Sequence, residues 1–473
     1  MRYNYLILFI CLFQGLQAQE QWNLASCVEY ALKNNVGLQQ SKIAVDEAAL
    51  TVKENKHKQI PDLNGSINGG ISFGRNIDPT SNSFTTENII SANYTLASGV
   101  TLFQGALIRN SIKQSKLSLD ASTKEYQQAT NDLALTIATY YLNVLLNEER
   151  LEMAEKNTES VKLQLIQMEK MIQSGVKPEA DAIEIKSQLA RMEQTQVSAE
   201  NGLDIAWLTL KQAMRLDPSK KLILERLTEE QLNGVQLENY TFEALSETAA
   251  QSQSGLQAAY KRLEAARMGE KIAKALYYPS LFLNASIGSR FSDAAIRPLD
   301  YSTSRILVPG VYIDGKSVLF EQDYPTVKST EVIPFKDQYD QFLGYGVGLN
   351  LNIPNYNKRS TKTRVQKAAL ATKSSELQAE LQKEKLNQDV YQAIANVRAA
   401  KKEFEASKRA LEATSYSADK TQKRFELGLA NVFELNLSQT NLQNAQSTLV
   451  IAKYDLVFKQ KVLDYYAGKP IKL

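Results

Sequence analysis

The chain has 473 residues, with 55 lysines and arginines against 52 aspartates and glutamates, and a formal net charge of +3. Basic and acidic residues alternate along helical patterns and no basic stripe stands alone, so composition gives no argument for a nucleic-acid partner. His57 is the only histidine, and no glycine-rich phosphate loop, metal-ligand cluster or nucleophile motif appears. We therefore expect no enzyme activity and no metal or cofactor.

We expect residues 1–19 to be a secretory signal peptide. Arg2 precedes the apolar run 5–13, and the small residue Ala18 precedes a polar stretch, so cleavage is expected near Ala18 or Gln19. The apolar run is too short to cross a bilayer as a helix. The mature chain is therefore predicted to leave the cytoplasm.

Cys27 becomes the only thiol once Cys11 leaves with the signal, so no internal disulfide can form. The stretch 24–27 resembles a bacterial lipobox, but residues 19–21 separate it from the apolar run that a lipobox should continue. Lipidation of Cys27 stays open at this point. The favoured interpretation is a small apolar residue on a helix.

The mature chain contains one pattern twice. Gly37-Leu38-Gln39 recurs 218 positions later as Gly255-Leu256-Gln257, and Gly175 recurs 253 positions later as Gly428. Internal repetition of this kind indicates a duplicated structural unit. We expect a first structural repeat at 20–235 and a second at 236–473, each with a helix, two strands and a helical hairpin in that order.

Long helices are expected where proline is absent. Residues 106–173 carry apolar and small residues every seven positions, and the same rows recur 253 positions later. A heptad repeat favours left-handed supercoiling of paired helices. A helix of about 67 residues would be about 100 Å long. Each ends at a glycine, Gly175 or Gly428, and a second helix follows, at about 185–210 and about 435–463, so each copy contains a coiled-coil hairpin. Residues 24–58 and 241–277 are expected to add one further helix per copy.

Four segments change to a period of two, with apolar residues alternating with polar residues or glycine. They lie at 63–73 and 90–102 in the first copy, and at 281–291 and 343–353 in the second. This length and pattern are typical of transmembrane β-strands. Between the last two strands, residues 292–340 contain four prolines and hold the extra length of the second copy. We expect them to form a long extracellular loop.

Four strands from one chain would leave bare sheet edges, which are not viable in lipid. A ring of several chains would close the strands into one barrel and the helices into a second. At this point the chain resembles the TolC outer-membrane efflux family over nearly its whole mature length. The resemblance rests on Trp22-Asn23-Leu24, Cys27-Val28, Ala31-Leu32, Asn34-Asn35, Leu38, Pro61-Asp62-Leu63, Leu102-Phe103-Gln104-Gly105 and the two glycine-tipped hairpins.

The resemblance implies a membrane β-barrel plus an α-helical barrel, with four transmembrane strands per protomer and a twelve-stranded barrel in a homotrimer. It implies a location in the outer membrane of a Gram-negative bacterium, in contact with outer-membrane lipid. The expected function is a channel-tunnel of a tripartite efflux or type I secretion system that conducts substrates passively. The expected partners are a periplasmic adaptor protein and an inner-membrane transporter of the RND, ABC or MFS type.

The family narrows its periplasmic entrance near the hairpin tips, often with acidic rings. One acidic position of the family matches Glu434, while the second falls on Leu437. In the first copy the matching stretch offers Asp181 and Glu184. A ring of Glu434 carboxylates would favour cations, but Glu434 is equally well explained as a solvated acid at a helix start. Phe433 is the alternative candidate, as an apolar constriction.

The hairpin tips are candidates for contact with the adaptor. These residues are Gly175, Val176 and Lys177 in the first tip and Gly428, Leu429, Ala430 and Asn431 in the second. The alternative is that they are only turns. The basic residue that latches this region in the family falls on Ala430, so we expect that latch to be absent.

A secreted coiled-coil scaffold or surface structural protein without a channel is the alternative function. It would account for the heptads and the signal peptide. It would not account for four alternating segments placed symmetrically in the two copies.

Overall fold

The structure is a computed structural model and describes residues 21–77, 82, 84–86, 88–226 and 240–469. The expected signal peptide lies outside the described residues. The chain divides into two compact units, which are described separately. The helical unit contains residues up to 50, residues 116–266 and residues from 371 onward, and the sheet unit contains residues 51–115 and 267–370.

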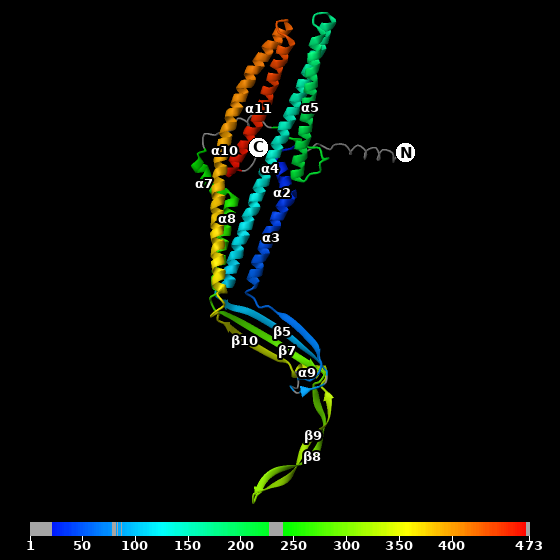
Figure 1. Cartoon of the computed structure of the whole chain (residues 1–473), viewed down its shortest axis with the longest axis vertical. Coiled ribbons are helices and arrows are strands. Elements are labelled where there is room, and N and C mark those ends of the chain that lie inside the picture. Colours follow the sequence, from blue (N-terminus) through cyan, green and yellow to red (C-terminus); the bar gives the residue numbers. More distant parts are fainter. Residues whose placement is uncertain (1–20, 78–81, 83, 87, 227–239, 470–473) are drawn as a thin grey trace, which may run out of the picture. The chain divides into compact units, whose positions relative to one another are not determined.

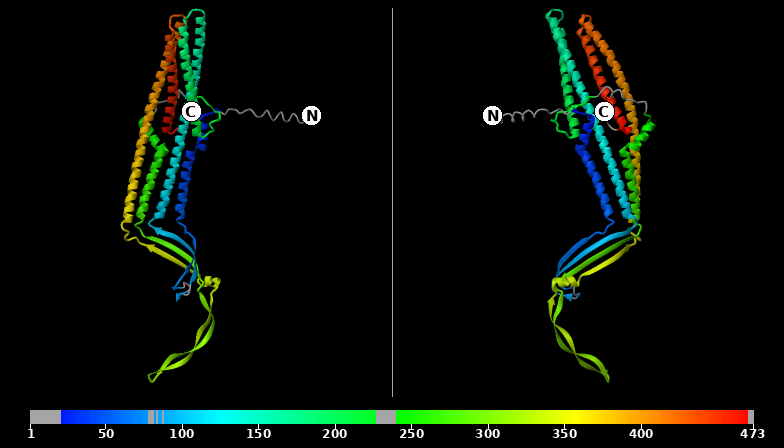
Figure 2. Two further views of the ribbon diagram at one scale, coloured as in Figure 1. Left: turned by 45° about the vertical axis from the view of Figure 1, so that its right-hand side comes forward. Right: turned by 180° about the vertical axis from the view of Figure 1, so that it is seen from behind.

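The helices occur in two matching sets. The first set is α2 (Leu24–Asn34), α3 (Val36–His57), α4 (Leu107–Gln173) and α5 (Glu179–Met214); the second is α7 (Phe242–Ser252), α8 (Ser254–Ala275), α10 (Ser360–Glu426) and α11 (Val432–Tyr466). Helices α4 and α10 each have 67 residues, the predicted length. Figures 1 and 2 show α4 beside α5, and α10 beside α11, as two antiparallel hairpins. Over the described part of the chain, no helix combines the length and apolar character needed to cross a membrane.

The sequence predicted a single helix ahead of the first strand in each copy, and this was wrong. Each is two helices, interrupted at Asn35 between α2 and α3 and at Gln253 between α7 and α8, where the backbone is extended. The Asn35 amide donates a hydrogen bond to the carbonyl of Ala213 (3.3 Å), and the Gln253 amide donates to the carbonyl of Tyr465 (3.3 Å). Each interruption is therefore held by the second helix of a hairpin, a long-range contact that local periodicity does not show.

The predicted heptad rows are the packed faces of the long helices. In α4 the rows include Ile137, Val144 and Val161, all buried, and in α10 they include Val390 and Val397, also buried. No member of either row is exposed. A seven-residue period keeps such residues on one seam of the helix pair.

The buried residues of the helical unit form three clusters. The first joins α2, α4, α5 and α11 around Tyr141, together with the short parallel strands β1 (Gln21–Trp22) and β6 (Ile223–Leu224). The second joins α7, α8, α10 and α11. The third, near the hairpin tips, joins α4, α5 and α11 through Met168, Ile185 and Val432. The two copies are therefore bound to each other at more than one level of the helical unit.

The sheet unit contains a four-stranded antiparallel sheet in the order β10-β7-β5-β2. Its strands are β2 (Asn64–Ser72), β5 (Ile89–Gln104), β7 (Ser280–Ser292) and β10 (Gly344–Asn352). These are the four predicted strands, with small differences at their ends. The central pair β5–β7 joins the first copy to the second.

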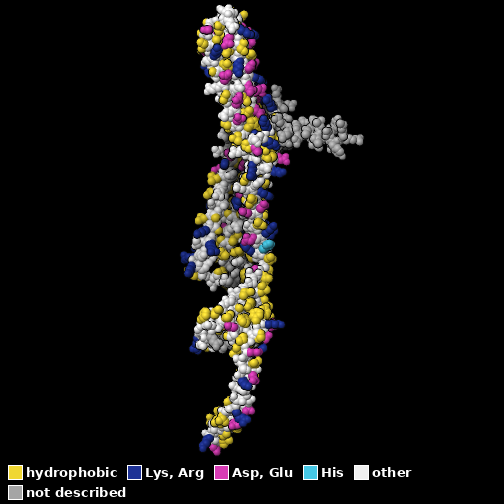
Figure 3. Space-filling view, turned by 90° about the vertical axis from the view of Figure 1, so that its right-hand side faces the viewer, with side chains coloured by type: hydrophobic (Ala, Val, Ile, Leu, Met, Phe, Trp, Pro, Cys, Tyr) yellow, Lys and Arg dark blue, Asp and Glu magenta, His cyan; other side chains and the backbone are white. Residues whose placement is uncertain are grey.

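The two faces of this sheet differ in polarity. The register places Leu349 beside Leu283, and Ile287 beside Leu96, on one face. The other face carries mainly glycine, asparagine and serine, including Gly288, which lies opposite Gly344. Several apolar side chains of the first face are exposed, and Figure 3 shows hydrophobic side chains gathered over the sheet. The period-two prediction is thus confirmed in both its apolar and its polar rows.

The segment expected to be a long loop is largely a β-hairpin. Strands β8 (Ile296–Ile313) and β9 (Lys316–Val332) pair antiparallel, and the short helix α9 (Phe335–Gln341) follows. This stretch contains four prolines, but in a two-stranded hairpin every strand is an edge, where proline is tolerated. The pairing register shifts beside Pro298 and Pro309, so the ladder also absorbs them as bulges.

Candidate functional site

The two hairpin tips are closed by the same turn. Gly175 and Gly428 have positive φ angles of 77° and 75°, a conformation that favours glycine. In the second tip the Gly428 N–H donates to the carbonyl of Phe425 (3.0 Å), and the Leu429 N–H donates to the carbonyl of Arg424 (2.7 Å). The first tip has the same pair of bonds. Both tips therefore have the same hydrogen-bonded turn, with glycine at the same position.

The adaptor-contact candidates differ in what they expose. Val176 and Leu429 present exposed apolar side chains at corresponding positions of the two tips. Lys177 of the first tip lies over the ring of Phe425 in the second hairpin, with its ammonium nitrogen 5.1 Å from the ring centroid. Ala430 is only 8% exposed, so its side chain adds little to this surface. Asn431 acts instead as the N-cap of α11.

Glu434 lies in the first turn of α11 and is held by two interactions. Its N–H donates to Oδ1 of Asn431 (2.8 Å), and its carboxylate lies 3.5 Å from the guanidinium of Arg424. Arg424 also donates to the carbonyl of Leu429 (3.1 Å). Arg424 was not predicted from the sequence, because the basic position of the family pattern falls on Ala430. The signal that could have indicated Arg424 is its position: it is a basic residue in the last turn of α10, and the glycine turn that follows brings this last turn close to the start of α11.

The other constriction candidates lie on the same tips. Asp181 is half-buried in the first turn of α5, and Glu184 is exposed with its carboxylate 3.8 Å from the guanidinium of Arg191. Phe433 is exposed. Its neighbour Val432 packs with residues of the first hairpin, so the structure brings the two tips together through an apolar contact.

A buried polar layer between α5 and α11 was not foreseen from the sequence. Gln188 donates a hydrogen bond to Gln439 (3.3 Å) across the two hairpins. Within the described residues, the side-chain oxygen Oε1 of Gln188 and both side-chain polar atoms of Asn436 are buried without a hydrogen-bond partner. This layer therefore places polar side chains where the two hairpins pack against each other.

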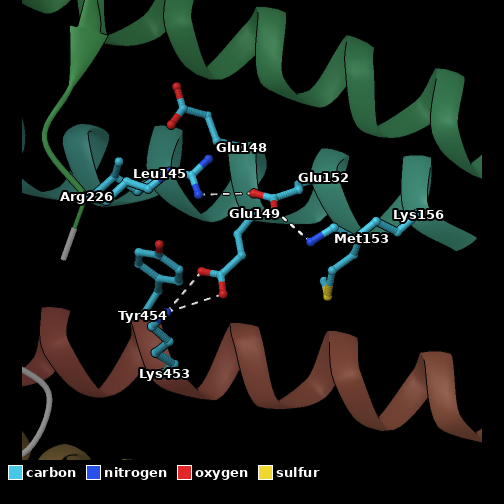
Figure 4. Close-up of a pocket in the computed structure, with 9 residues that line it drawn as sticks. All are labelled: Leu145, Glu148, Glu149, Glu152, Met153, Lys156, Arg226, Lys453 and Tyr454. Atoms are coloured by element: carbon cyan, nitrogen blue, oxygen red, sulfur yellow. Dashed lines mark hydrogen bonds and ion pairs between the residues drawn. The ribbon is translucent and has the colours of Figure 1, made fainter. Parts of the chain in front are cut away.

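A cavity of about 330 Å³ lies between α4 and α11 and is lined by charged groups (Figure 4). Lys453 of α11 pairs with Glu149 of α4 (3.2 Å), and Arg226 pairs with Glu152 (3.1 Å). Burial raises the pKa of the third carboxyl, Glu148, above its ordinary value, and the nearby Arg226 opposes that shift. Lys156 of α4 also pairs with Glu152 (2.8 Å), so three acids face three cations and the cluster has no excess of either charge.

A sheet with one apolar face, joined to paired coiled-coil hairpins with glycine tips, defines an outer-membrane channel architecture. The family model described as "Outer membrane efflux protein" matches residues 27–214 and 245–469. The chain belongs to this family, which is one of efflux channels rather than of enzymes. It is an outer-membrane protein.

Individual relatives agree with this assignment. The outer membrane protein TolC of Vibrio cholerae is 22% identical over 492 residues, covering 98% of this chain and 97% of the relative. The solved structure of CusC has a TM-score of 0.77 at 16% identity, covering 94% of this chain and 92% of that chain. VceC of Vibrio cholerae has a TM-score of 0.74 at 14% identity, covering 95% and 97%. At these identities the structural likenesses establish the fold alone.

Proposed function

We propose that this chain is one protomer of a homotrimeric channel-tunnel that conducts substrates passively across the outer membrane and the periplasm. The observation that carries the proposal is the four-stranded sheet, in which, over the described residues, the outer strands β2 and β10 each pair with one strand. Lipid provides no partner for open backbone groups, so a membrane sheet must close. Three copies joined edge to edge would form a twelve-stranded barrel, with the apolar face toward lipid and the polar face around the lumen.

The helical unit supports the periplasmic half of the proposal. The chain contributes two hairpins of equal design, so three chains would place six around one axis as a second, helical barrel. The exposed tips would then be the surface for a periplasmic adaptor protein, through the pair Val176 and Leu429. An inner-membrane transporter of the RND, ABC or MFS type would supply the energy.

The periplasmic entrance is proposed to lie at the tips, with Glu434 as the charged group that faces the passage. Asp181, Glu184 and Phe433 are the other groups proposed to narrow it. Arg424 supplies a basic partner for Glu434, so the ring would be partly neutralised at rest. This arrangement would favour cations over anions at a narrow constriction.

The proposal can be tested by electrophoresis and conductance measurements on protein purified in detergent. We expect a trimer that resists SDS at room temperature, dissociates on boiling, and gives discrete single-channel conductance in planar bilayers. A monomer that leaves the membrane fraction without detergent and gives no conductance would contradict the channel. That result would favour the scaffold alternative.

A further inference from the structure

Helix α9 is fixed to the end of the sheet at which β7 ends. Its Gln338 is fully buried, with a relative exposure of 0%. The Ser292 N–H donates to Oε1 of Gln338 (2.9 Å), and the Gln338 amide donates to the carbonyls of Ser292 and Ile333 (2.8 Å each). The Ser289 hydroxyl donates to the carbonyl of Tyr339 (2.8 Å). The position of α9 on the sheet is therefore set by the fold.

Beside Gln338 on α9, Phe335 and Tyr339 form an aromatic cluster with the sheet. Its members are Tyr94 of β5, Phe291 of β7, and Phe335 and Tyr339 of α9. The ring centroids of Phe335 and Phe291 are 5.6 Å apart, and those of Phe335 and Tyr94 are 5.9 Å apart. Phe335 and Tyr339 nevertheless remain 52% and 41% exposed. The cluster is thus assembled within the chain but is not covered by it.

This cluster continues the apolar face of the sheet. The strand pairing places Tyr94 beside Ser289 and Phe291 beside Ala92, in the same alternating rows as the exposed Leu349. From Leu281 to Phe291 the strand β7 is about 33 Å long, which is about 25 Å along the membrane normal at the usual tilt of about 40°. That is about the height of the apolar band of a transmembrane barrel.

Charged groups lie on α9 and continue beyond the cluster. Arg297, at the base of β8, pairs with Asp337 of α9 (3.2 Å) and with Glu331 of β9 (2.6 Å). Farther along the hairpin, Arg305 pairs with Asp323 (3.2 Å). Aromatic rings followed at once by ion pairs match the boundary between acyl chains and headgroups, where tyrosine is enriched. A second protein copy would have no reason to prefer this ordering along the membrane normal.

We propose that α9 and the aromatic cluster are a membrane-surface foot that seats on the outer leaflet of the outer membrane, at the boundary between acyl chains and headgroups. The inference rests on the proposed barrel and adds to it the level at which the chain leaves the lipid. The foot fixes the sheet at one depth and keeps the whole β8–β9 hairpin in the aqueous phase outside the cell.

Site-directed spin labelling of trimers reconstituted in phospholipid vesicles tests the foot. The native Cys27 is fully buried and should not react with the spin label, so wild-type protein treated with the label is the blank. Nitroxides would be placed at Leu349→Cys on the sheet, Tyr339→Cys on α9 and Tyr312→Cys on the hairpin, and their access to oxygen and to a nickel chelate measured. We expect the oxygen-to-nickel ratio to fall several-fold from Leu349→Cys to Tyr339→Cys, and again to Tyr312→Cys. Phe335→Cys replaces Tyr339→Cys if that variant does not assemble.

The outcomes separate the foot from the channel. If the label on α9 meets the nickel chelate as readily as the label on the hairpin, α9 lies in water and the foot is wrong. If the label on α9 meets neither reagent, protein covers it and the foot is again wrong. If the label at Leu349→Cys does not meet oxygen, the sheet does not face lipid and the proposed barrel itself fails.

Discussion

Arg424 and Glu434 pair across the tip of the second hairpin, with the guanidinium 3.5 Å from the carboxylate. Exposed pairs of this kind contribute about 0–1 kcal/mol, so Arg424→Gln should leave stability nearly unchanged. The substitution should instead leave the negative charge of Glu434 without its basic partner and so raise cation selectivity, measured as the reversal potential across a salt gradient. Glu434→Gln should lower cation selectivity.

Lys420→Gln is the matched control for Arg424→Gln. It removes one positive charge from the same helix, where Lys420 lies over the ring of Tyr416 (5.1 Å) rather than beside Glu434. Equal cation selectivity in Arg424→Gln and Lys420→Gln would show that the Arg424–Glu434 pair does not control selectivity at the entrance.

Gly288 should be essential for joining the two copies in the sheet. A Cβ there would lie 2.7 Å from the backbone carbonyl oxygen of Tyr94, so the β5–β7 pairing would have to shift. We expect Gly288→Ala to cost about 1–3 kcal/mol and to reduce the yield of SDS-resistant trimer. Gly344→Ala is the control, since Gly344 lies opposite Gly288 and a Cβ there meets nothing within 4 Å. Equal trimer yields from the two variants would show that the close approach is unimportant.

The thiol of Cys27 should be unreactive in the folded protein. Burial raises its pKa to about 12, so almost no thiolate exists at pH 8, and the side chain is also inaccessible. A maleimide reagent should label the protein only after denaturation. Rapid stoichiometric labelling of the native trimer would show that α2 is not packed as described.

Tyr141 should stabilise the junction of α4 with β1 and β6. Its hydroxyl donates a hydrogen bond of 2.7 Å to the carbonyl of Glu225. Tyr141→Phe would leave this carbonyl without its donor, at a cost of about 1–2 kcal/mol in the free energy of unfolding. Tyr140→Phe, at a half-buried neighbouring position, is the control and should change stability by less than about 0.5 kcal/mol. Denaturant titration in detergent measures both, and equal effects would contradict the role of this bond.

Glu148 should make stability depend on pH in a specific direction. Its pKa is raised in the folded state, chiefly by burial, so the carboxyl favours folding below its unfolded pKa, and this contribution is lost as pH rises through the folded pKa. Glu148→Gln should therefore unfold at a higher temperature than the wild type at pH 8. The difference should disappear below about pH 4, where the acid is protonated in both states. A stabilisation that persists unchanged in acid would point to a cause other than charge burial.

The repeated helices and strands could be predicted because the spacing of apolar residues reflects the local geometry of each element. The seven-residue spacing of Ile137 and Val144 and the two-residue spacing of Leu349 and Leu351 can both be seen within short stretches of sequence. The division at Asn35 was missed because its partner, the carbonyl of Ala213, is far away in the chain. The β8–β9 hairpin was not predicted, and it accommodates its prolines because both of its strands are edges.

The candidate entrance was predicted less completely. Glu434 became a candidate through its place in a family pattern, and its role at an entrance stays a prediction. Its partner Arg424 was not predicted, because pairing across a glycine turn depends on how two helices diverge. The buried atoms of Asn436 and Gln188 were also invisible in the sequence. Their burial depends on two hairpins meeting, which a single periodic row does not specify.

The equal lengths of α4 and α10 constrain how this protein can change over evolutionary time. Inserting or deleting one residue in either helix would rotate everything beyond it by about 100° and move it by about 1.5 Å. The tip of that hairpin would then no longer match the tip of the other hairpin in position. The apolar row between the change and the tip would also turn away from the partner helix and toward water. Changes of length are consequently expected to be tolerated at the turn of the β8–β9 hairpin, near Asp314 and Gly315, and to be removed by selection from the long helices.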